Sequence, residues 1–167
     1  MTKRPMSEHA KAAKIIRQEL KAHGIKGSVT SSSYAGGTSI RVNVENLEPW
    51  VLESIKRFTS KFEYGHFDGM TDCYEYSNNR DDIPQVKYLF VNCSYSDELR
   101  QQAYDYLRAN WAGYEDHPKQ YSEAINLRGT SRWVNDEVWQ VLNGSWDAMC
   151  STGCIKFWKK PHVRLAA

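Results

Sequence analysis

The segment from residue 27 to 45 limits the possible folds more than any other part of the chain. Ile40, Val42 and Val44 alternate with polar neighbours, which is the two-residue period of a strand buried on one face only. A run of serine and threonine precedes this strand, and residues 34–38, with two glycines, form the expected turn. The sequence therefore predicts a β-hairpin whose polar face carries Arg41.

Two amphipathic helices flank this hairpin in the sequence. From about residue 7 to 23, Ala12, Ile16 and Leu20 recur at helical spacing, and Gly24 follows as a stop signal. A second helix is predicted from residue 48 to 62, with Pro49 suited to its first turn. Its apolar stripe consists of Val51, Ile55, Phe58 and Phe62. Both stripes are expected to cover one face of a sheet.

Residues 62–76 combine glycines, aspartates and interleaved aromatic residues, and they lead into a third predicted strand at 73–76. A loop at 77–84, a fourth strand at 86–92 and a helix to about residue 111, capped by Ser94 or Ser96, follow. The order helix-strand-strand-helix-strand-strand-helix predicts an α+β sandwich with a mostly antiparallel sheet. We assign this domain to residues 1–113.

The remaining residues, 114–167, are distinguished by four of the six tryptophans. Val134, Val138 and Val141 predict a short helix, and a basic, strand-like tail follows at 155–160. We expect this Trp-rich C-terminal extension to pack on the first domain with most of its tryptophans in the core. Trp158, which lies among lysines, is the candidate for contact with a partner.

Composition excludes several classes of protein. The 167 residues are 41% hydrophobic and 25% charged, as in folded globular domains. No stretch reaches about 18 consecutive apolar residues, and the N-terminus lacks the apolar run of a secretory signal. We therefore expect a protein of the cytoplasm with no membrane partner. Cys73, Cys93, Cys150 and Cys154 lack zinc-site or disulfide spacing, so thiols are expected, without metal or cofactor.

Charge is distributed unevenly along the chain. Residues 1–62 carry eleven Lys and Arg against five Asp and Glu, whereas residues 63–98 carry two against eight. Such asymmetry suits electrostatic docking onto a charged partner, although the two segments could also neutralise each other in the fold.

Four short motifs resemble a known family. They are the IRQELK run at 16–21, the turn and strand at 34–42, the FDGMTDCYEY segment at 67–76 and the DIPQVKY run at 82–88. Together they resemble the large polyvalent protein-associated domain family, specifically its member numbered twenty-nine, over roughly residues 10–95. The FDGMTD run is the most specific of the four, and the portion from about residue 114 onward lies outside the resemblance.

The resemblance implies a role in mobile genetic elements. Members of this family occur in proteins of phages, plasmids and conjugative elements, often within very long proteins that enter a new host with the invading DNA. The family offers no established catalytic residues to carry over. A free-standing protein of this size is similar to small anti-restriction and anti-CRISPR proteins, which implies action in the cytoplasm of a bacterial host.

Two hypotheses about binding follow. In the first, the protein counters a host defence system by binding a defence protein or nucleoprotein complex sterically, with an acidic patch in place of nucleic-acid phosphates. Its candidate residues are Asp68, Asp72, Glu75, Asp81 and Asp82, for which solubility and capping are the alternative explanation. In the second, the protein is a nucleic-acid-binding module of a mobile element. Its candidate partner-binding residues are Tyr34, Arg41, Lys56, Arg57, Lys61 and Trp158.

An enzyme is the third hypothesis. Asp68, Asp72 and Glu75, with His66, offer oxygen and nitrogen ligands for a divalent ion. If residues 73–76 form a strand, however, Asp72 and Glu75 point to opposite faces and do not converge. The sequence contains no P-loop, HExxH or GxSxG motif. We therefore expect no catalytic residues, although a metal-dependent activity stays open as an alternative. The sequence does not indicate an oligomeric state.

Overall fold

The computed structural model describes residues 5–110, 117–125, 133–144 and 157–158. Within these ranges the protein is α+β, with four helices, a three-stranded sheet and a two-stranded sheet. The chain divides into two compact units. The first contains the described residues up to 45 and residues 51–94, and the second contains residues 46–50 and the described residues from 95 onward. The helix that begins at residue 97 thus belongs to the second unit, whereas the sequence interpretation placed it in the first domain.

The main sheet of the first unit consists of β1 (Gly27–Tyr34), β2 (Gly37–Glu45) and β5 (Tyr88–Ser94), in the order β1-β2-β5. β1 and β2 are antiparallel and form the predicted hairpin, which closes where Tyr34 pairs with Gly37. β5 is parallel to β2, with Arg41 opposite Phe90. Parallel neighbours need a crossover connection, and α2 (Pro49–Ser60) lies within it. The sheet is therefore mixed.

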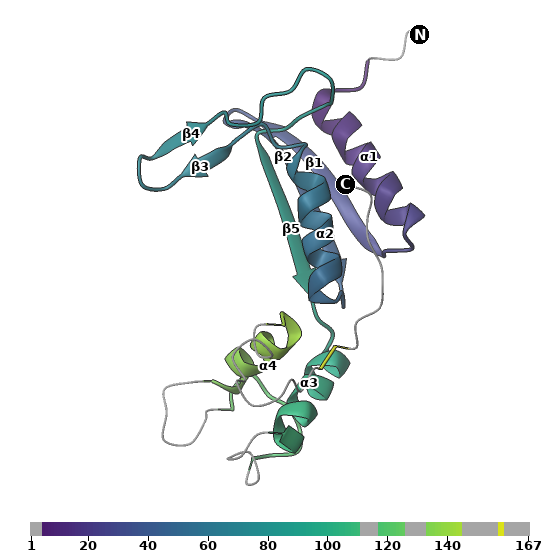
Figure 1. Cartoon of the computed structure of the whole chain (residues 1–167), viewed down its shortest axis with the longest axis vertical. Coiled ribbons are helices and arrows are strands. Elements are labelled where there is room, and N and C mark those ends of the chain that lie inside the picture. Colours follow the sequence, from purple (N-terminus) through teal and green to yellow (C-terminus); the bar gives the residue numbers. More distant parts are fainter. Residues whose placement is uncertain (1–4, 111–116, 126–132, 145–156, 159–167) are drawn as a thin grey trace. The chain divides into compact units, whose positions relative to one another are not determined.

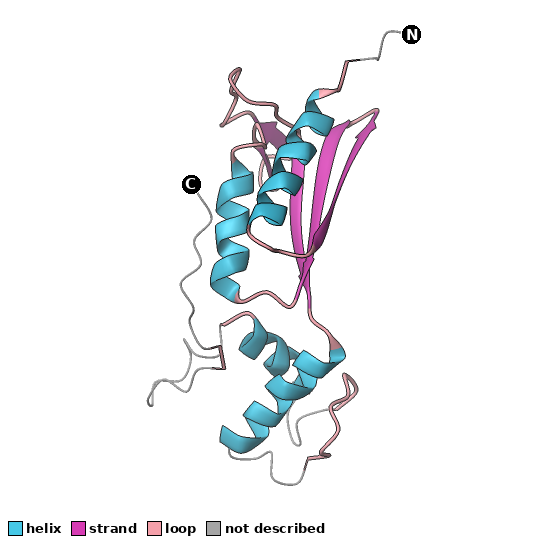
Figure 2. Cartoon of the chain, turned by 90° about the vertical axis from the view of Figure 1, so that its right-hand side faces the viewer, coloured by secondary structure: helices cyan, strands magenta, loops and turns pink. Residues whose placement is uncertain are grey.

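Two helices cover the same face of this sheet, as Figures 1 and 2 show for α1 (Glu8–Ala22) and α2. Ile40, Val42 and Val44 are fully buried beneath them. The stripes predicted from helical spacing are buried as well, at Ala12, Ile16, Leu20, Val51, Ile55, Phe58 and Phe62. The Arg17 side chain also ties α1 to the sheet, because its Nη2 donates to the Val29 carbonyl at 2.7 Å. The predicted one-sided apolar core is confirmed.

The third predicted strand does not join the main sheet. Residues 73–75 form β4 (Cys73–Glu75), which pairs antiparallel with β3 (His66–Asp68) in a separate hairpin. Figure 1 shows this hairpin extending away from the sheet. The close approach of its two strands requires Gly65, since a Cβ there would collide with the Glu75 carbonyl. The expectation of one sheet with four strands is therefore wrong: local pairing across a tight turn replaces it.

The second unit is helical in its described part. α3 (Asp97–Asn110) packs against α4 (Val134–Leu142), and their buried side chains include Ala103, Tyr104, Leu107, Val134, Val138 and Val141. Of the two predicted caps, Ser94 and Ser96, it is Ser96 that caps α3, because its Oγ accepts a hydrogen bond from the Leu99 N–H at 3.3 Å. The short helix predicted from the valine spacing is confirmed as α4.

Two tryptophans of the second unit are less buried than expected. Trp133 and Trp139 are 47% and 46% exposed, so the valines of α4 rather than these rings fill the core. Trp139 packs edge-on against Tyr95 at 5.1 Å between ring centroids. Trp146 and most of the predicted basic tail lie outside the described residues. None of the described helices has both the length and the apolar character required to cross a lipid bilayer.

Candidate functional site

The face of the main sheet opposite α1 and α2 is polar and aromatic. The register places alternate residues of neighbouring strands on it in rows. One row consists of Thr30, Arg41 and Phe90, and the next of Ser32, Ser39 and Tyr88. We refer to this surface as the open face. Its chemistry follows from the same alternation that sends Ile40 and Val42 into the core.

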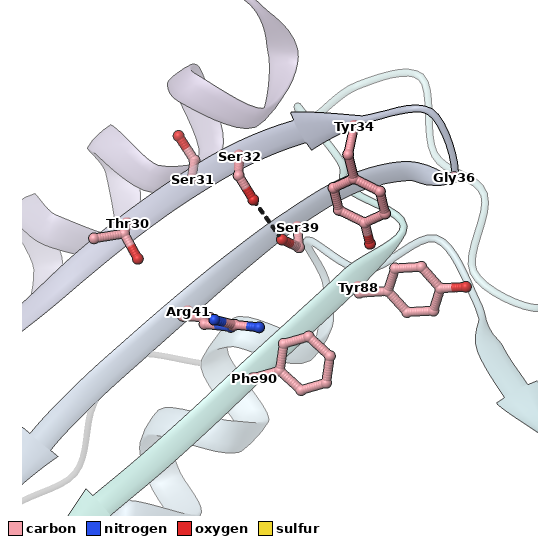
Figure 3. Close-up of a pocket in the computed structure, with 9 residues that line it drawn as sticks. All are labelled: Thr30, Ser31, Ser32, Tyr34, Gly36, Ser39, Arg41, Tyr88 and Phe90. Atoms are coloured by element: carbon pink, nitrogen blue, oxygen red, sulfur yellow. Dashed lines mark hydrogen bonds between the residues drawn. The ribbon is translucent and has the colours of Figure 1, made fainter.

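A pocket of about 610 Å³ lies on the open face. Figure 3 shows nine of its lining residues, with Tyr34 near the hairpin turn and the rings of Tyr88 and Phe90 along β5. The floor between the strands is hydroxylic: the Oγ atoms of Ser32 and Ser39 are hydrogen-bonded at 2.8 Å. The other lining residues are Thr30, Ser31, Gly36 and Arg41. The pocket thus joins ring surface, hydroxyl groups and one cation.

Arg41 supplies that cation. Its guanidinium carbon lies 5.9 Å from the centroid of the Phe90 ring, within the range of a cation–π contact. Among the residues that the structure describes, no carboxylate forms an ion pair with Arg41, and no acidic residue lines the pocket. An exposed arginine without a carboxylate partner is available to pair with an anionic ligand.

The rings of β5 form the aromatic side of the pocket. Tyr88 and Phe90 lie two residues apart on the strand, and their rings are nearly parallel, with a 12° interplanar angle and centroids 6.4 Å apart. Phe90 is 45% exposed and Tyr34 is 49% exposed. Large rings exposed on a sheet face are available for stacking with planar ligand groups.

Lys87 adds a second cation at the turn end of the pocket. Its Nζ donates to the Gly36 carbonyl at 3.1 Å and lies 5.3 Å from the centroid of the Tyr88 ring. The lysine stem crosses Gly37, where a Cβ would come within 2.8 Å of the Lys87 Cδ. Gly37 also has φ of +140°, which L side chains rarely adopt. The glycine therefore lets Lys87 approach the turn.

Three of the predicted acidic residues lie on the β3–β4 hairpin, where Asp68 stabilises the turn. Asp68 accepts hydrogen bonds from the Met70 N–H and the Thr71 hydroxyl, both at 2.8 Å. These bonds lower the pKa of Asp68, with the Met70 bond as the largest cause. Asp72 adopts φ of 54° in the turn, and Glu75 lies 3.4 Å from the His66 ring. The hairpin thus brings Asp68 and Glu75 near His66, with Asp68 engaged in the turn.

The loop after the hairpin carries the other two predicted acids. Asp82 pairs with Arg80 through two hydrogen bonds, of 2.9 and 2.5 Å, and this pairing lowers the pKa of Asp82. Asp81 is exposed. Within the described ranges, no group of three or more His, Cys, Asp or Glu side chains is arranged to hold a metal ion.

The predicted basic residues do not form one surface. Lys56 and Arg57 are exposed on α2, and Lys61 follows that helix with its Nζ 4.5 Å from the Phe58 ring centroid. α2 covers the face opposite Arg41, so these cations and Arg41 are separated by the sheet. Trp158 lies in the second unit, where its indole donates to the Leu142 carbonyl at 3.0 Å. Tyr34 and Arg41 are the predicted residues that the open face brings together.

Sequence reasoning missed Tyr88, Phe90, Ser32 and Ser39 as site residues. The alternation of Tyr88, Phe90 and Asn92 along the predicted fourth strand was the available signal, because these residues share one face of a strand. Their place beside Arg41 depends on β5 pairing with β2, which local periodicity does not specify.

Glu63 lies at the boundary between the sheet and the preceding helix. Its Oε1 accepts from the Leu89 N–H at 3.0 Å, at the start of β5. Burial raises the pKa of Glu63, and the Leu89 hydrogen bond and nearby His66 oppose this shift. The carboxylate thus covers a backbone donor at the outer edge of β5.

These features define the first unit as an α+β domain with helices on one face of a mixed sheet and a cationic, aromatic pocket on the other. A family model described as "Large polyvalent protein associated domain 29" matches residues 7–104, which is more than half of the chain. The chain therefore belongs to this family, as its motifs indicate. Comparison with curated proteins and with solved structures found no match.

Proposed function

We propose that the protein is a binding module whose open face holds single-stranded nucleic acid. The observation that carries the proposal is the pocket in which Arg41, which pairs with no carboxylate of the described residues, lies beside the rings of Tyr88 and Phe90. Aromatic rings that stack with unpaired bases, and cations that meet the phosphates, are the usual components of such sites.

The rings favour unpaired bases over a duplex. In a double helix the faces of each base are already stacked, whereas an unpaired base can place a face on an exposed ring. Phe90 and Tyr34 offer such rings on two strands of the open face. Each stacked base contributes about 1–3 kcal/mol in known single-strand complexes.

The hydroxyl groups and cations suit the rest of a nucleotide. The Ser32–Ser39 pair and Thr30 offer donors and acceptors next to Arg41. Arg41 and Lys87 are positive, and none of the described residues that line the pocket is acidic. A protein surface of opposite sign, rich in carboxylates, would meet the same cations, but it would leave the exposed rings without planar groups to stack on.

Salt-dependent binding to oligonucleotides tests the proposal. The probe is a labelled oligothymidylate of about 12 nucleotides, and fluorescence anisotropy measures its affinity for the protein. The same measurement is made with the duplex form of the probe. We expect tighter binding of the single strand, and Arg41→Gln should weaken it and reduce the slope of log affinity against log salt by about 0.7. Arg57→Gln is the matched control, because Arg57 is exposed on α2, on the covered side of the sheet. Equal losses for both variants, or no binding by the wild type, would contradict the proposal.

A second candidate is action against a host defence system by steric binding of a defence complex. The observation that favours it is the tip of the β3–β4 hairpin, where Met70 is 95% exposed and Phe67 is 52% exposed. The Asp68 hydrogen bonds stabilise the turn that carries Met70. The family's association with large polyvalent proteins is consistent with this role.

Affinity capture separates the two candidates. Complexes that bind the tagged protein are purified from host lysate with and without nuclease treatment, and their compositions are compared. The defence-complex proposal expects one complex that survives nuclease treatment and is lost with Met70→Ser but not with Phe90→Ala. The opposite pattern, loss with Phe90→Ala and with nuclease, supports nucleic-acid binding instead.

A further inference from the structure

A second aromatic cluster adjoins the pocket. It consists of Tyr64, Tyr74 and Tyr76, from the segment before β3 and from β4 and the residue after it. Tyr74 meets Tyr76 edge-on at 5.1 Å between centroids, and Tyr64 and Tyr76 are stacked at 5.7 Å with planes 7° apart. Tyr76 is 65% exposed, so much of its ring is open to solvent.

Tyr74 connects this cluster to the open face. Its ring meets the Tyr88 ring edge-on at 5.5 Å, and its hydroxyl donates to the Lys87 carbonyl at 2.5 Å. The Lys87 ammonium lies 5.2 Å from the Tyr74 ring and 5.3 Å from the Tyr88 ring. A row of rings therefore runs from Phe90 through Tyr88 and Tyr74 to Tyr76, with a cation beside its middle.

Hydrogen bonds to the backbone hold the cluster in place. Asn78 donates from Nδ2 to the Glu63 carbonyl at 2.8 Å, and its N–H donates to the Tyr64 carbonyl at 3.2 Å. Gln85 donates from Nε2 to the carbonyls of Lys61 and Asn78, at 2.9 and 2.8 Å. The segment that carries Tyr76 is thus fixed to the segment that carries Tyr64. A surface fixed before binding loses little conformational entropy when a ligand arrives.

We propose that the nucleic-acid site continues from the pocket past Lys87 onto Tyr76, so that it holds a longer single strand than the pocket alone. The inference rests on the proposed function of the open face. Bases 5′ or 3′ to the one in the pocket stack on Tyr76, and Lys87 meets the phosphate between them. The β3–β4 hairpin carries the family's FDGMTD motif at its tip. In this proposal the base of the hairpin supports the second stacking position at Tyr76.

The length dependence of binding tests the inference in the full-length protein. The probes are oligothymidylates of about 4 and about 12 nucleotides, a short and a longer length within the range of single-strand site sizes. We expect Tyr76→Ala to weaken binding of the longer probe about 10-fold and to leave the shorter probe unchanged. Tyr76→Phe should retain the wild-type affinity for both, because it keeps the ring, and Phe90→Ala should weaken both.

The outcomes distinguish the two proposals. If the wild type binds both probes and Tyr76→Ala has no effect on the longer one, the extension is wrong and the pocket stands. If the wild type binds neither probe, the proposed function itself fails. Thermal unfolding of each variant serves as the control for folding. Because Tyr76 is mostly exposed but its ring contacts Tyr64 and Tyr74, we expect a small decrease in the midpoint for Tyr76→Ala and no loss of cooperative unfolding.

Discussion

The two faces of the β1-β2-β5 sheet share three strands but differ in chemistry. On the covered face, Ile40, Val42 and Val44 are fully buried, whereas their neighbour Arg41 is exposed on the open face. A slip of one residue in register would exchange the two sets, so burial of the covered face fixes the positions of the open-face groups. The comparison shows how core packing can position a binding surface without contacting the ligand.

The two faces also contribute to different properties: the covered face to folding stability and the open face to binding. The covered face excludes apolar side chains from water, which is the dominant favourable contribution to folding. The open face leaves Phe90 and Tyr34 about half exposed, so these rings add little to the core. Substitutions of adjacent residues on one strand should therefore have separable effects.

The largest expected effect is on the covered face. Ile40→Ala should lower the free energy of unfolding by about 2–5 kcal/mol, because it leaves a cavity at a fully buried position. Arg41→Ala, at the next residue, should change it by no more than about 0.5 kcal/mol. Urea unfolding followed by circular dichroism measures both. Equal losses for the two variants would show that the open face is part of the core.

A smaller effect is expected on β5, where Val91 and Phe90 point to opposite faces. Phe90→Ala should weaken single-strand binding by about 1–3 kcal/mol with little change in stability, since one stacking ring is lost. Val91→Ala should lower the free energy of unfolding by about 0.5–1.5 kcal/mol and leave the affinity unchanged, because it removes only part of a half-buried side chain. Anisotropy titrations and urea unfolding are run on both variants. The comparison fails if Val91→Ala weakens binding while its fold is intact.

The smallest effect concerns Glu63, at the edge of β5. Its raised pKa means that the folded protein holds the Glu63 proton more tightly than the unfolded chain does. Stability should therefore increase as pH falls through the raised pKa toward the ordinary glutamate value, and it should be lower above that window. Glu63→Gln keeps an acceptor for the Leu89 N–H but cannot ionise, so it should remove this pH dependence.

Chemical unfolding of wild type and Glu63→Gln at several pH values makes the comparison. At neutral pH the variant should differ by less than about 1 kcal/mol, because the lost charge-assisted hydrogen bond and the relieved burial of charge oppose each other. An unchanged pH profile in the variant would show that Glu63 does not titrate in the folded protein as its burial indicates.

Local pattern predicted much of the first unit. The alternation of Ile40, Val42 and Val44 predicted the hairpin and the outward direction of Arg41, and helical spacing predicted both covering helices. These features depend on residues close in sequence, whose periods of 2 and 3.6 are properties of the backbone itself. The family motifs were equally local, and the family match over residues 7–104 agrees with them.

Long-range pairing determined the candidate site. Phe90 is far from Arg41 in the sequence, and the parallel pairing of β5 with β2 brings the two together. No local period indicates which strand a strand will join. The same limit explains the incorrect four-stranded sheet, because residues 73–75 have an alternating pattern that fits either the main sheet or a separate hairpin with residues 66–68.

Local sequence was enough to assign the side chains of each strand to opposite faces, because the pleat of the backbone alternates them regardless of the partner strand. It also determined the stripes of the helices and the turn at Gly37. By contrast, the position of the β5 rings beside Arg41 and their connection through Tyr74 to Tyr76 are visible in the folded protein alone. The reason is that strand order and hairpin docking depend on the packing of segments distant in the chain, which becomes defined only when the apolar face is buried.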